Sequence, residues 1–577
     1  MNNDNALTRR MFLLLNAKII LFFILISKIF YIQVFCKKKY QLLSDKNRKQ
    51  ITYIIPQRGK ILDIKRKVIS SEKKFFELVI NTNQNINYDT LISKIVLILK
   101  LQKLKNQLLT KIKNHPKHNK IVILNNMKWH DVVKIEENII NLKGVSIEIG
   151  NGREYQQKEM MAHIIGYVGL VNKREQKEYN LKDININIGK SGIEKQYENL
   201  LRGQLGLKEI QVDAFNKKKC SSIITQEHKG KDITLSINLT IQKYVSDAIK
   251  EYNGAVIIME SQTGNVVSLV SKPSFNPNNM ISEIAKKKLN SSKKTSLFNK
   301  VTQGLYPPGS IFKIITFLTA LENGINVDHT YYCCGKIKVG KNIFHCFKKE
   351  GHGLVNMEEA FYKSCNCYTY WLSQKLGAQK IIKIAKILNL DKKSEIDLPY
   401  ERNSTFSEIE NKINSSTYKW KLGDTINLSI GQGFICMNMC QILKLINFFA
   451  TNGKIITPTL LNSASNKSIT TNIKDKNIKI MKNLLYKVVN HPQGTGKMNR
   501  ININGMNMCG KTGTAQVKRT SLNLNTKHKS HGIFSGYAPF DNPKYSMAII
   551  TENTGFASIH TVPIASKIFS YLLKNHI

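Results

Sequence analysis

The longest run of hydrophobic positions lies near the N-terminus, from Phe12 to Phe35, where Ile, Leu and Phe dominate. Its length fits a membrane-spanning helix, although Lys18 and Lys28 interrupt it. No small-x-small cleavage site follows, so the segment is predicted to remain in the protein as a signal anchor. Basic residues stand on both sides of it, so charge alone does not fix the orientation of the anchor.

The next part of the chain, to about residue 235, mixes two patterns. Short apolar runs such as 120–124 are typical of strands, and Lys-rich amphipathic stretches such as 91–113 are typical of helices. Internal repeats and Gly/Ser linkers are absent from this part of the sequence. We therefore predict a separate region over 37–235.

From residue 236 onward the pattern changes to buried strands that enclose a long helical segment, 311–450. Strands at both ends of a domain, with helices between them, favour one antiparallel sheet covered by helices. The predicted fold class is therefore α+β, in three parts: an anchor (1–36), a separate α+β region (37–235) and a C-terminal domain (236–577). The strands are predicted at 254–259, 265–270, 508–517, 533–537 and 545–551, and a closing helix at 562–574.

The large net charge of the chain excludes few classes of function. The chain has 577 residues and a net charge of +47, and 42% of its residues are hydrophobic. Nucleic-acid binding would need basic residues clustered on a recognisable module, and none is found, so no nucleic-acid partner is predicted. Attraction to an anionic surface stays open. The abundance of Lys, Asn and Ile throughout the chain favours compositional drift as the explanation.

The strongest chemical signal is Ser310 with Lys313, directly after Tyr306-Pro307-Pro308-Gly309. The prolines resist helix before them, and the apolar run 311–321 reads as a buried helix, so Ser310 is predicted in its first turn. Lys313 then lies on the same face, where a partly desolvated lysine can accept the serine proton. Taken alone, the pair is also compatible with a helix cap and a snorkelling lysine.

Two later motifs decide between these interpretations. Ser364-Cys365-Asn366 and Lys511-Thr512-Gly513-Thr514 follow in the order that marks serine penicillin-recognising enzymes. Further segments resemble the class B penicillin-binding proteins over nearly the whole chain, most closely their elongation-type members, the penicillin-binding proteins 2. They are 56–63, 162–169, Gly192-Ile193-Glu194, Leu201-Arg202-Gly203 and Ile430-Gly431-Gln432-Gly433. Structural roles are predicted for these segments, including Arg58 and His163.

The resemblance implies a peptidoglycan D,D-transpeptidase that β-lactams acylate. It also implies that 37–235 form an elongated, non-catalytic pedestal of the dimerisation type, which carries the transpeptidase domain 236–577. Ser310 attacks the penultimate D-Ala carbonyl of a stem peptide, Lys313 is the predicted base and Ser364 relays a proton to the leaving amine. Backbone N–H groups of Ser310 and Thr514 are the expected oxyanion hole. The predicted substrate-binding residues are Asn366, which orients the amide, Lys511, Thr512 and Thr514, which hold the carboxylate, and Gly513, which keeps the strand edge clear.

Four residues around the second motif predict a zinc site: Cys334, Cys346, His352 and Cys365. Three thiolates and an imidazole form a good tetrahedral set, although the tight C-x2-C spacing is missing. Some elongation-type members place a metal-binding set at these positions. Cys333 in place of Cys334, a disulfide, and free thiols stay open as alternatives. The Zn²⁺ would brace the loop that presents Ser364, and no organic cofactor is expected.

The resemblance also implies the setting of the enzyme. A single-pass anchor would hold the catalytic domain on the outer, periplasmic face of the cytoplasmic (inner) membrane. Stem peptides and a lipid-linked precursor would be the substrates. The sequence has no glycosyltransferase motif, so a RodA-like membrane glycosyltransferase and other elongation-complex proteins are the expected partners. A division-type transpeptidase, a serine β-lactamase, and a β-lactam sensor or scaffold without turnover are the alternatives.

Overall fold

The computed structural model describes residues 4–81, 87–113, 120–181, 184, 186–212, 218–280, 297–462, 468–501, 503, 506–515 and 530–575. By its internal contacts the chain divides into two units. The first consists of Met1–Arg58, Leu181–Ile184 and Arg202–Gly230, and the second of Gly59–Asn180, Asn185–Leu201 and Lys231–Ile577. The boundaries of the three predicted parts stay a prediction.

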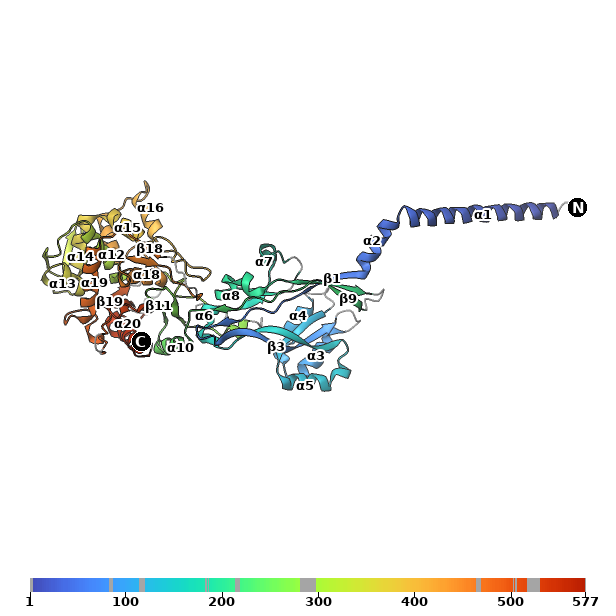
Figure 1. The fold of residues 1–577 in the computed structure, drawn as a ribbon, viewed down its shortest axis with the longest axis horizontal. Coiled ribbons are helices and arrows are strands. Elements are labelled where there is room, and N and C mark those ends of the chain that lie inside the picture. Colours follow the sequence, from blue (N-terminus) through green and yellow to red (C-terminus); the bar gives the residue numbers. More distant parts are fainter. Residues whose placement is uncertain are drawn as a thin grey trace. The chain divides into compact units, whose positions relative to one another are not determined.

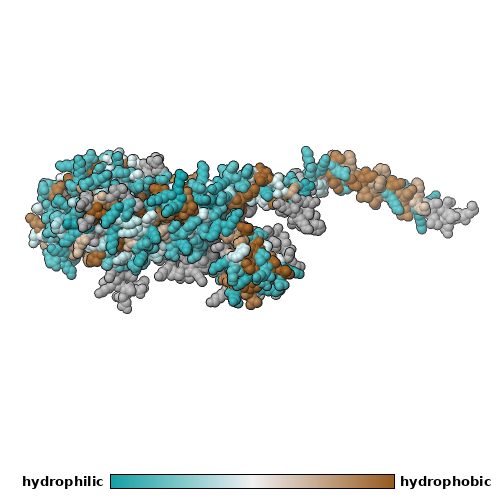
Figure 2. Space-filling view, turned by 60° about the horizontal axis from the view of Figure 1, so that its bottom comes forward, coloured by the Kyte–Doolittle hydropathy of each residue, from teal (hydrophilic) through white to brown (hydrophobic). Residues whose placement is uncertain are grey.

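The first unit contains the apolar N-terminal helix α1 (Asp4–Val34), followed by α2 (Lys37–Arg48). Between Arg9 and Val34, α1 is long and hydrophobic enough to cross a membrane, and Figure 2 shows hydrophobic side chains along it. The unit also holds an antiparallel sheet in the order β1 (Lys49–Ile54), β8 (Gly206–Val212), β9 (Lys218–Thr225). The prediction of one N-terminal apolar helix is confirmed.

The second unit begins with a sheet in the order β10-β2-β3-β4, with β5 also paired to β3. Its strands are β2 (Ile61–Leu62), β3 (Val68–Asn81), β4 (Lys120–Met127), β5 (Val145–Tyr155) and β10 (Ile233–Thr234). The helical stretch predicted at 91–113 is divided into α3 (Tyr88–Ile98), a short 3₁₀ turn (Gln102–Leu104) and α4 (Lys105–Lys113). Lys100 has a positive φ of 53°, and this left-handed residue ends the first helix. Helix α5 (Trp129–Glu137) completes this subdomain, which we call the head.

Short elements lead from the head toward the C-terminal sheet. They are α6 (Ala162–Ile165), β6 (Val168–Leu170), α7 (Lys173–Glu178), β7 (Asn187–Gly189), α8 (Gly192–Gln196), α9 (Glu198–Arg202) and α10 (Leu239–Ala248).

The C-terminal part is built on a five-stranded antiparallel sheet in the order β12-β11-β21-β20-β19. Figure 1 labels β11 and β19 of this sheet. Its strands are β11 (Gly254–Glu260), β12 (Val266–Lys272), β19 (Cys509–Ala515), β20 (His531–Ala538) and β21 (Tyr545–Thr551). All five predicted strands are present, and two residues of the stretch 508–517 lie outside the described residues. The register brings strands from both ends of the domain into one sheet, so the predicted α+β fold is confirmed.

Helices cover both faces of this sheet. On β20, the Ser535 hydroxyl donates to the Ile442 carbonyl of α18 (Met439–Ala450), while a Cβ on Gly532 would meet Thr561 of α20 (Ala557–Asn575). Because these positions are an odd number of residues apart, α18 and α20 lie on opposite faces. Strand β19, which carries the third motif, is the edge strand beside them.

The other elements between β12 and β19 form the helical cover and its short connections. The helices are α12 (Lys313–Glu322), α13 (Met357–Tyr362), α14 (Asn366–Leu376), α15 (Ala378–Ile387), α16 (Phe406–Ile413), α17 (Leu422–Ser429) and α19 (Asp475–Asn490). The short strands are β13 (Tyr331–Cys333), β14 (Lys336–Val339), β15 (Asn342–His345), β16 (Gly353–Val355), β17 (Lys454–Ile456) and β18 (Ser468–Thr470).

Candidate active site and thiol cluster

Ser310 lies in a 3₁₀ turn, Gly309–Ile311, directly before α12, which starts at Lys313. The sequence predicted Ser310 inside the first turn of the helix, so the helix begins slightly later than expected. Gly309 has a φ of 54°, which a residue with a side chain adopts only with strain. Its N–H donates to the Gly431 carbonyl at 3.0 Å, which fixes the start of the turn.

Two glycines let this nucleophile turn, Gly309–Ile311, lie against the edge strand β19. A Cβ on Gly309 would come within 2.6 Å of the Thr514 carbonyl oxygen. A Cβ on Gly513 would come within 2.9 Å of the Pro308 carbonyl oxygen. Both distances are too short for a carbon atom, so glycine is required on both sides of the contact. The space that Gly513 leaves is therefore taken by the nucleophile turn.

The hydroxyl of Ser364 is the centre of the candidate active site. It donates to Ser310 Oγ at 3.1 Å and lies 3.2 Å from both Lys313 Nζ and Lys511 Nζ. Ser364 has a φ of 55°, a left-handed conformation uncommon for a residue other than glycine. Local strain of this kind is often kept where it serves a site, and here it accompanies a hydroxyl between the serine and both lysines.

Both lysines are buried, and burial determines their charge. Lys313 Nζ donates to the Ser364 carbonyl and to Asn366 Oδ1, both at 2.7 Å. Burial lowers the pKa of Lys313 to about 8, so a substantial fraction is neutral near physiological pH. Burial also lowers the pKa of Lys511 well below its usual value, and the charge of Lys313 lowers it further. The site therefore contains an amine that can accept a proton.

The predicted substrate-binding residues lie along β19 and beside it. Thr512 is buried, and its hydroxyl lies 2.9 Å from the hydroxyl of Thr495, while Thr514 is half-buried at the edge. Sequence reasoning missed Thr495. Its signal is the Gly494-Thr495-Gly496 turn that follows α19, but a glycine-flanked threonine is too common to stand out.

A second cluster adjoins the active site, and we call it the thiol cluster: Cys333, Cys346, His352 and Cys365. One ligand atom from each of these residues lies within 4.8 Å of the others. The predicted ligand Cys334 is wrong, because its side chain is exposed and its thiol donates to the Lys336 carbonyl. Strand β13 ends at Cys333, and successive side chains along an extended chain point in opposite directions, so Cys333 faces inward and Cys334 outward.

The geometry of the thiol cluster suits a tetrahedral ion. His352 Nδ1 lies 3.5 Å from Cys346 Sγ and 3.6 Å from Cys333 Sγ. A hydrogen bond from the Cys365 thiol, with a further one from His352, lowers the pKa of Cys333 to about 5. All ten cysteines lie in described ranges, and the three cysteines of the thiol cluster are free thiols. The hydrogen bond between Cys365 and Cys333, together with one to Cys346, raises the pKa of the Cys365 thiol, so this proton would leave when an ion binds. Three sulfur donors and one imidazole fit Zn²⁺.

The two clusters meet at one backbone N–H. Asn366 N–H donates to Cys346 Sγ at 3.4 Å, and Cys365 caps the start of α14 by accepting from Tyr368 N–H. Residues on both sides of Cys365 belong to the active site. An ion held by Cys346 and Cys365 would therefore fix the segment that presents Ser364.

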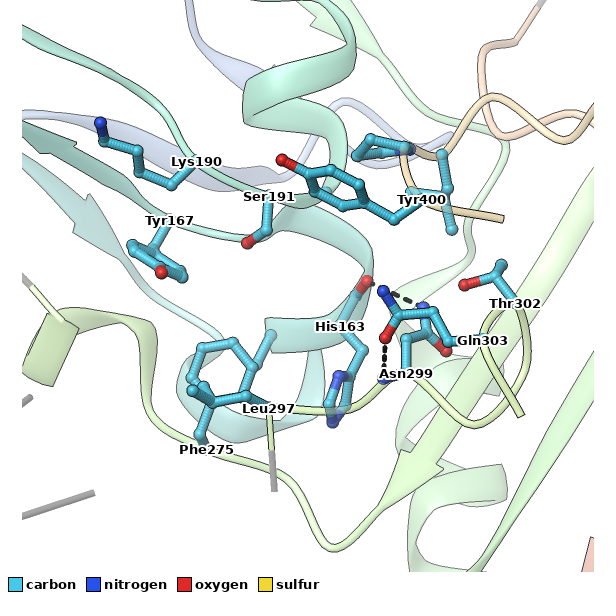
Figure 3. Close-up of a pocket in the computed structure, with 14 residues that line it drawn as sticks. His163, Tyr167, Lys190, Ser191, Phe275, Leu297, Asn299, Thr302, Gln303 and Tyr400 are labelled. Atoms are coloured by element: carbon cyan, nitrogen blue, oxygen red, sulfur yellow. Dashed lines mark hydrogen bonds between the residues drawn. The ribbon is translucent and has the colours of Figure 1, made fainter. Parts of the chain in front are cut away.

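A pocket of about 230 Å³ lies between α6, α8 and the segment 297–303 (Figure 3). His163, which lines it, packs edge-on against Phe275, and burial lowers its pKa to about 4. The Asn299 amide donates to the His163 carbonyl at 3.3 Å. These contacts agree with the structural role predicted for His163.

Comparison with known proteins agrees with this geometry. Residues 254–570 match the family model described as the penicillin-binding protein transpeptidase domain, and residues 53–235 match the penicillin-binding protein dimerisation domain. The chain is 30% identical to the peptidoglycan D,D-transpeptidase MrdA of Acinetobacter baumannii, over 98% of this chain and 87% of that protein. The chain belongs to the penicillin-binding proteins.

Further relatives define the branch of this penicillin-binding protein. The MrdA transpeptidase of Haemophilus influenzae is 28% identical over 99% of this chain and 93% of that protein. The solved complex of penicillin-binding protein 2 and MreC from Helicobacter pylori matches with a TM-score of 0.81 and 25% identity. That match covers 92% of this chain and 99% of the solved one. The predicted elongation-type peptidoglycan D,D-transpeptidase, a serine-type acyl-transfer enzyme with a single membrane anchor, is confirmed.

Proposed function

We propose that Ser310 is the nucleophile of this penicillin-binding protein and that Lys313 and Ser364 move its proton. The observation that carries the proposal is the Ser364 hydroxyl, which lies within hydrogen-bond distance of Ser310 Oγ and of both lysine Nζ atoms. A nucleophile within reach of a base, with that base oriented by further groups, is the arrangement that activates a hydroxyl.

In the first half-reaction, Ser310 Oγ attacks the carbonyl carbon of the penultimate D-Ala of a donor stem peptide. The Ser310 proton passes to neutral Lys313, and the backbone N–H groups of Ser310 and Thr514 stabilise the oxyanion. The peptide C–N bond then breaks, and Ser364 relays a proton from Lys313 to the leaving amine. Free D-Ala departs, and the donor remains as an ester on Ser310.

In the second half-reaction, an amine of a neighbouring stem peptide attacks this ester. An amide bond forms, the ester C–O bond breaks, and the proton lost by the amine returns to Ser310. A β-lactam follows only the first half, because its amide is in a ring and the leaving group stays attached. Asn366 orients the donor amide. Thr512 and Thr514 bind the carboxylate of the donor, together with the buried Lys511.

Labelling with a fluorescent penicillin tests this assignment. Wild-type protein and Ser274→Ala, which removes a remote hydroxyl bonded to the Glu159 carbonyl, should both be labelled. Ser310→Ala should not be labelled, and equal labelling of it would overturn the proposal. Crosslinking of a lipid-linked precursor then separates a synthase from a sensor, because only the synthase releases one D-Ala for each crosslink.

We also propose that the thiol cluster holds one structural Zn²⁺ through Cys333, Cys346, His352 and Cys365. When bound, the ion supplies cross-linking between β13, the loop after β15 and the start of α14, and it takes no part in bond making. Support comes from the donor set and from the Asn366 N–H bond to Cys346 Sγ. Elemental analysis of protein purified under reducing conditions should find about one zinc per chain. A small fraction of that amount would contradict the proposal.

We propose further that the catalytic domain works on the periplasmic face of the inner membrane, with a RodA-like glycosyltransferase and other elongation-complex proteins as partners. The Helicobacter pylori complex with MreC supports this class of partner. The head offers an exposed apolar surface: Trp129 is 67% exposed and packs on Phe76, and Ile149, paired with Phe76 across β3 and β5, is also 67% exposed. Trp129→Glu should weaken capture of the MreC-type partner and leave penicillin labelling unchanged. Unchanged capture would contradict a role for this surface.

A further inference from the structure

A group of four side chains outside the three motifs lies beside the nucleophile turn: Lys300, Tyr306, His531 and Glu552. Lys300 and Glu552 form an ion pair through Nζ and Oε2, and their side chains are only 6% and 19% exposed. The other carboxylate oxygen of Glu552 accepts a hydrogen bond from the Tyr306 hydroxyl at 2.8 Å. One carboxylate therefore joins two buried side chains from the segment that leads to Ser310.

Glu552 is presented by a rigid part of the fold. It directly follows β21, an inner strand of the five-stranded sheet, and its N–H donates to the Asn253 carbonyl at 2.8 Å. The next residue, Asn553, donates its N–H to His531 Nδ1 at 3.0 Å. The His531 ring packs edge-on against the Tyr306 ring, with centroids 5.8 Å apart. The position of the Tyr306 side chain is thus set by the sheet.

The Tyr306 backbone is fixed from the other side. It exchanges two hydrogen bonds with Met437, of 3.0 and 2.9 Å. Pro307, Pro308 and Gly309 are all that separate Tyr306 from Ser310, and the φ angles of both prolines are restricted by their rings. A displacement of Tyr306 is therefore transmitted along a short, stiff segment to the nucleophile.

We infer that Tyr306 and Glu552 are positioning residues that set the location of Ser310 against Thr514. The inference rests on the proposed role of Ser310 and extends it to residues that touch neither substrate nor nucleophile. The nucleophile turn and β19 approach each other closely, because a Cβ on either Gly309 or Gly513 would clash across this contact. Lys300 supplies the positive charge that the buried Glu552 carboxylate needs.

Acylation kinetics with a fluorescent penicillin separate positioning from plain stabilisation. Tyr306→Phe keeps the ring and its packing against His531 but loses the bond to Glu552. We expect the acylation rate constant to fall about 10- to 100-fold, the cost of a displaced reacting group, while the final labelling per chain stays complete. Loss of folded protein alone would lower the final labelling and leave the rate constant of the remainder unchanged.

The chain offers a matched control for this variant. Tyr197 donates its hydroxyl to Asp397 Oδ2 at 2.9 Å, the same type of bond, in a part of the second unit that does not lead into Ser310. Tyr197→Phe should lose a similar hydrogen bond and keep an acylation rate within about twofold of wild type. Ser310→Ala, run in parallel, should not be labelled at all.

If Tyr306→Phe does not fold, a pair of double variants tests the hydrogen bond between Tyr306 and Glu552. Lys300→Met with Glu552→Gln removes the buried charges but keeps an amide oxygen that can accept from Tyr306. Lys300→Met with Glu552→Ala removes the acceptor as well. The first double variant should be acylated at least about fivefold faster than the second, which corresponds to one hydrogen bond.

Two results would overturn the inference. One is an acylation rate of Tyr306→Phe within about twofold of the Tyr197→Phe control, a margin below the effect of one hydrogen bond. The other is equal rates for the two double variants. Labelling of Ser310→Ala would instead overturn the proposed function, so the two failures are distinguishable.

Discussion

The active site and the thiol cluster share the segment Ser364–Asn366, yet different interactions hold each of them together. The active site is an arrangement of hydroxyl and amine groups that meet at Ser364 Oγ. The thiol cluster is a set of soft donors from β13, the loop after β15 and the start of α14. The first works only while its protons can move, whereas the second is proposed to be rigid. On the proposed assignments, a mobile proton network lies beside a fixed support.

The largest effect on the active site is expected from a substitution of Lys313. Lys313→Met should reduce the acylation rate constant by about 10²- to 10⁴-fold, the range for loss of a general base. Zinc content should not change, because Lys313 hydrogen-bonds to Ser364 and Asn366 and is not one of the four proposed ligands. The measurement is fluorescent-penicillin acylation with parallel elemental analysis. Lys348→Met, at an exposed position, serves as the control, and similar acylation rates for both variants would contradict the assigned base.

The thiol cluster is tested by two neighbouring cysteines. Cys333→Ser should reduce zinc from about one per chain to a small fraction and lower the melting temperature, because one of four ligands is lost. Cys334→Ser should leave both unchanged, since Cys334 is exposed. Elemental analysis and thermal unfolding check this prediction. Equal zinc loss in both variants would show that the inward and outward assignments are incorrect.

The pH dependence of acylation tests whether the active site uses a neutral lysine as its base. Burial lowers the pKa of Lys313 to about 8, so the neutral fraction increases as the pH rises toward that value. The acylation rate constant should therefore rise about tenfold per pH unit below pH 8 and level off above it. Lys313→Met should remove this rise. A rate that is flat or falls between about pH 6 and 8 would exclude a neutral lysine base.

The smallest effect is expected at Thr495. Thr495→Val keeps the shape of the side chain but removes the hydroxyl that contacts Thr512. Loss of one hydrogen bond of about 1 kcal/mol should raise the KM for a stem peptide roughly fivefold and change kcat little. Steady-state release of D-Ala measures both parameters. A fall in kcat with unchanged KM would place Thr495 in proton transfer and outside substrate binding.

Much of the fold could be predicted from the sequence because its strands are buried on both faces. Runs such as Ala255–Met259 and Tyr545–Thr551 are almost wholly apolar, and a sheet packed between helices requires that pattern. The division of 91–113 into two helices was not predictable from periodicity. Hydrophobic spacing continues across Lys100, and its left-handed backbone, which ends the first helix, has no signal in that spacing.

The sequence predicted those site residues that belong to a recognisable motif. The structure brings together Ser310, Lys313, Ser364 and Lys511, which lie within hydrogen-bond distance of one another through the Ser364 hydroxyl. Cys333 and Cys334 differ only in direction, which adjacent identical residues cannot reveal. Glu552 and Thr495 were missed because each acts through a partner distant in sequence, Tyr306 and Thr512 respectively.

The burial of Lys511 has a consequence for how the enzyme recognises its donor. Both lysine nitrogens lie 3.2 Å from the same hydroxyl, so mutual repulsion disfavours two ammonium groups there. A carboxylate arriving beside Thr512 favours a proton on Lys511, and that charge in turn favours neutral Lys313. We therefore expect a donor with an amidated C-terminus to lose kcat as well as affinity, and a change in KM alone would contradict this. On this account the terminal carboxylate switches on the base that attacks its own peptide.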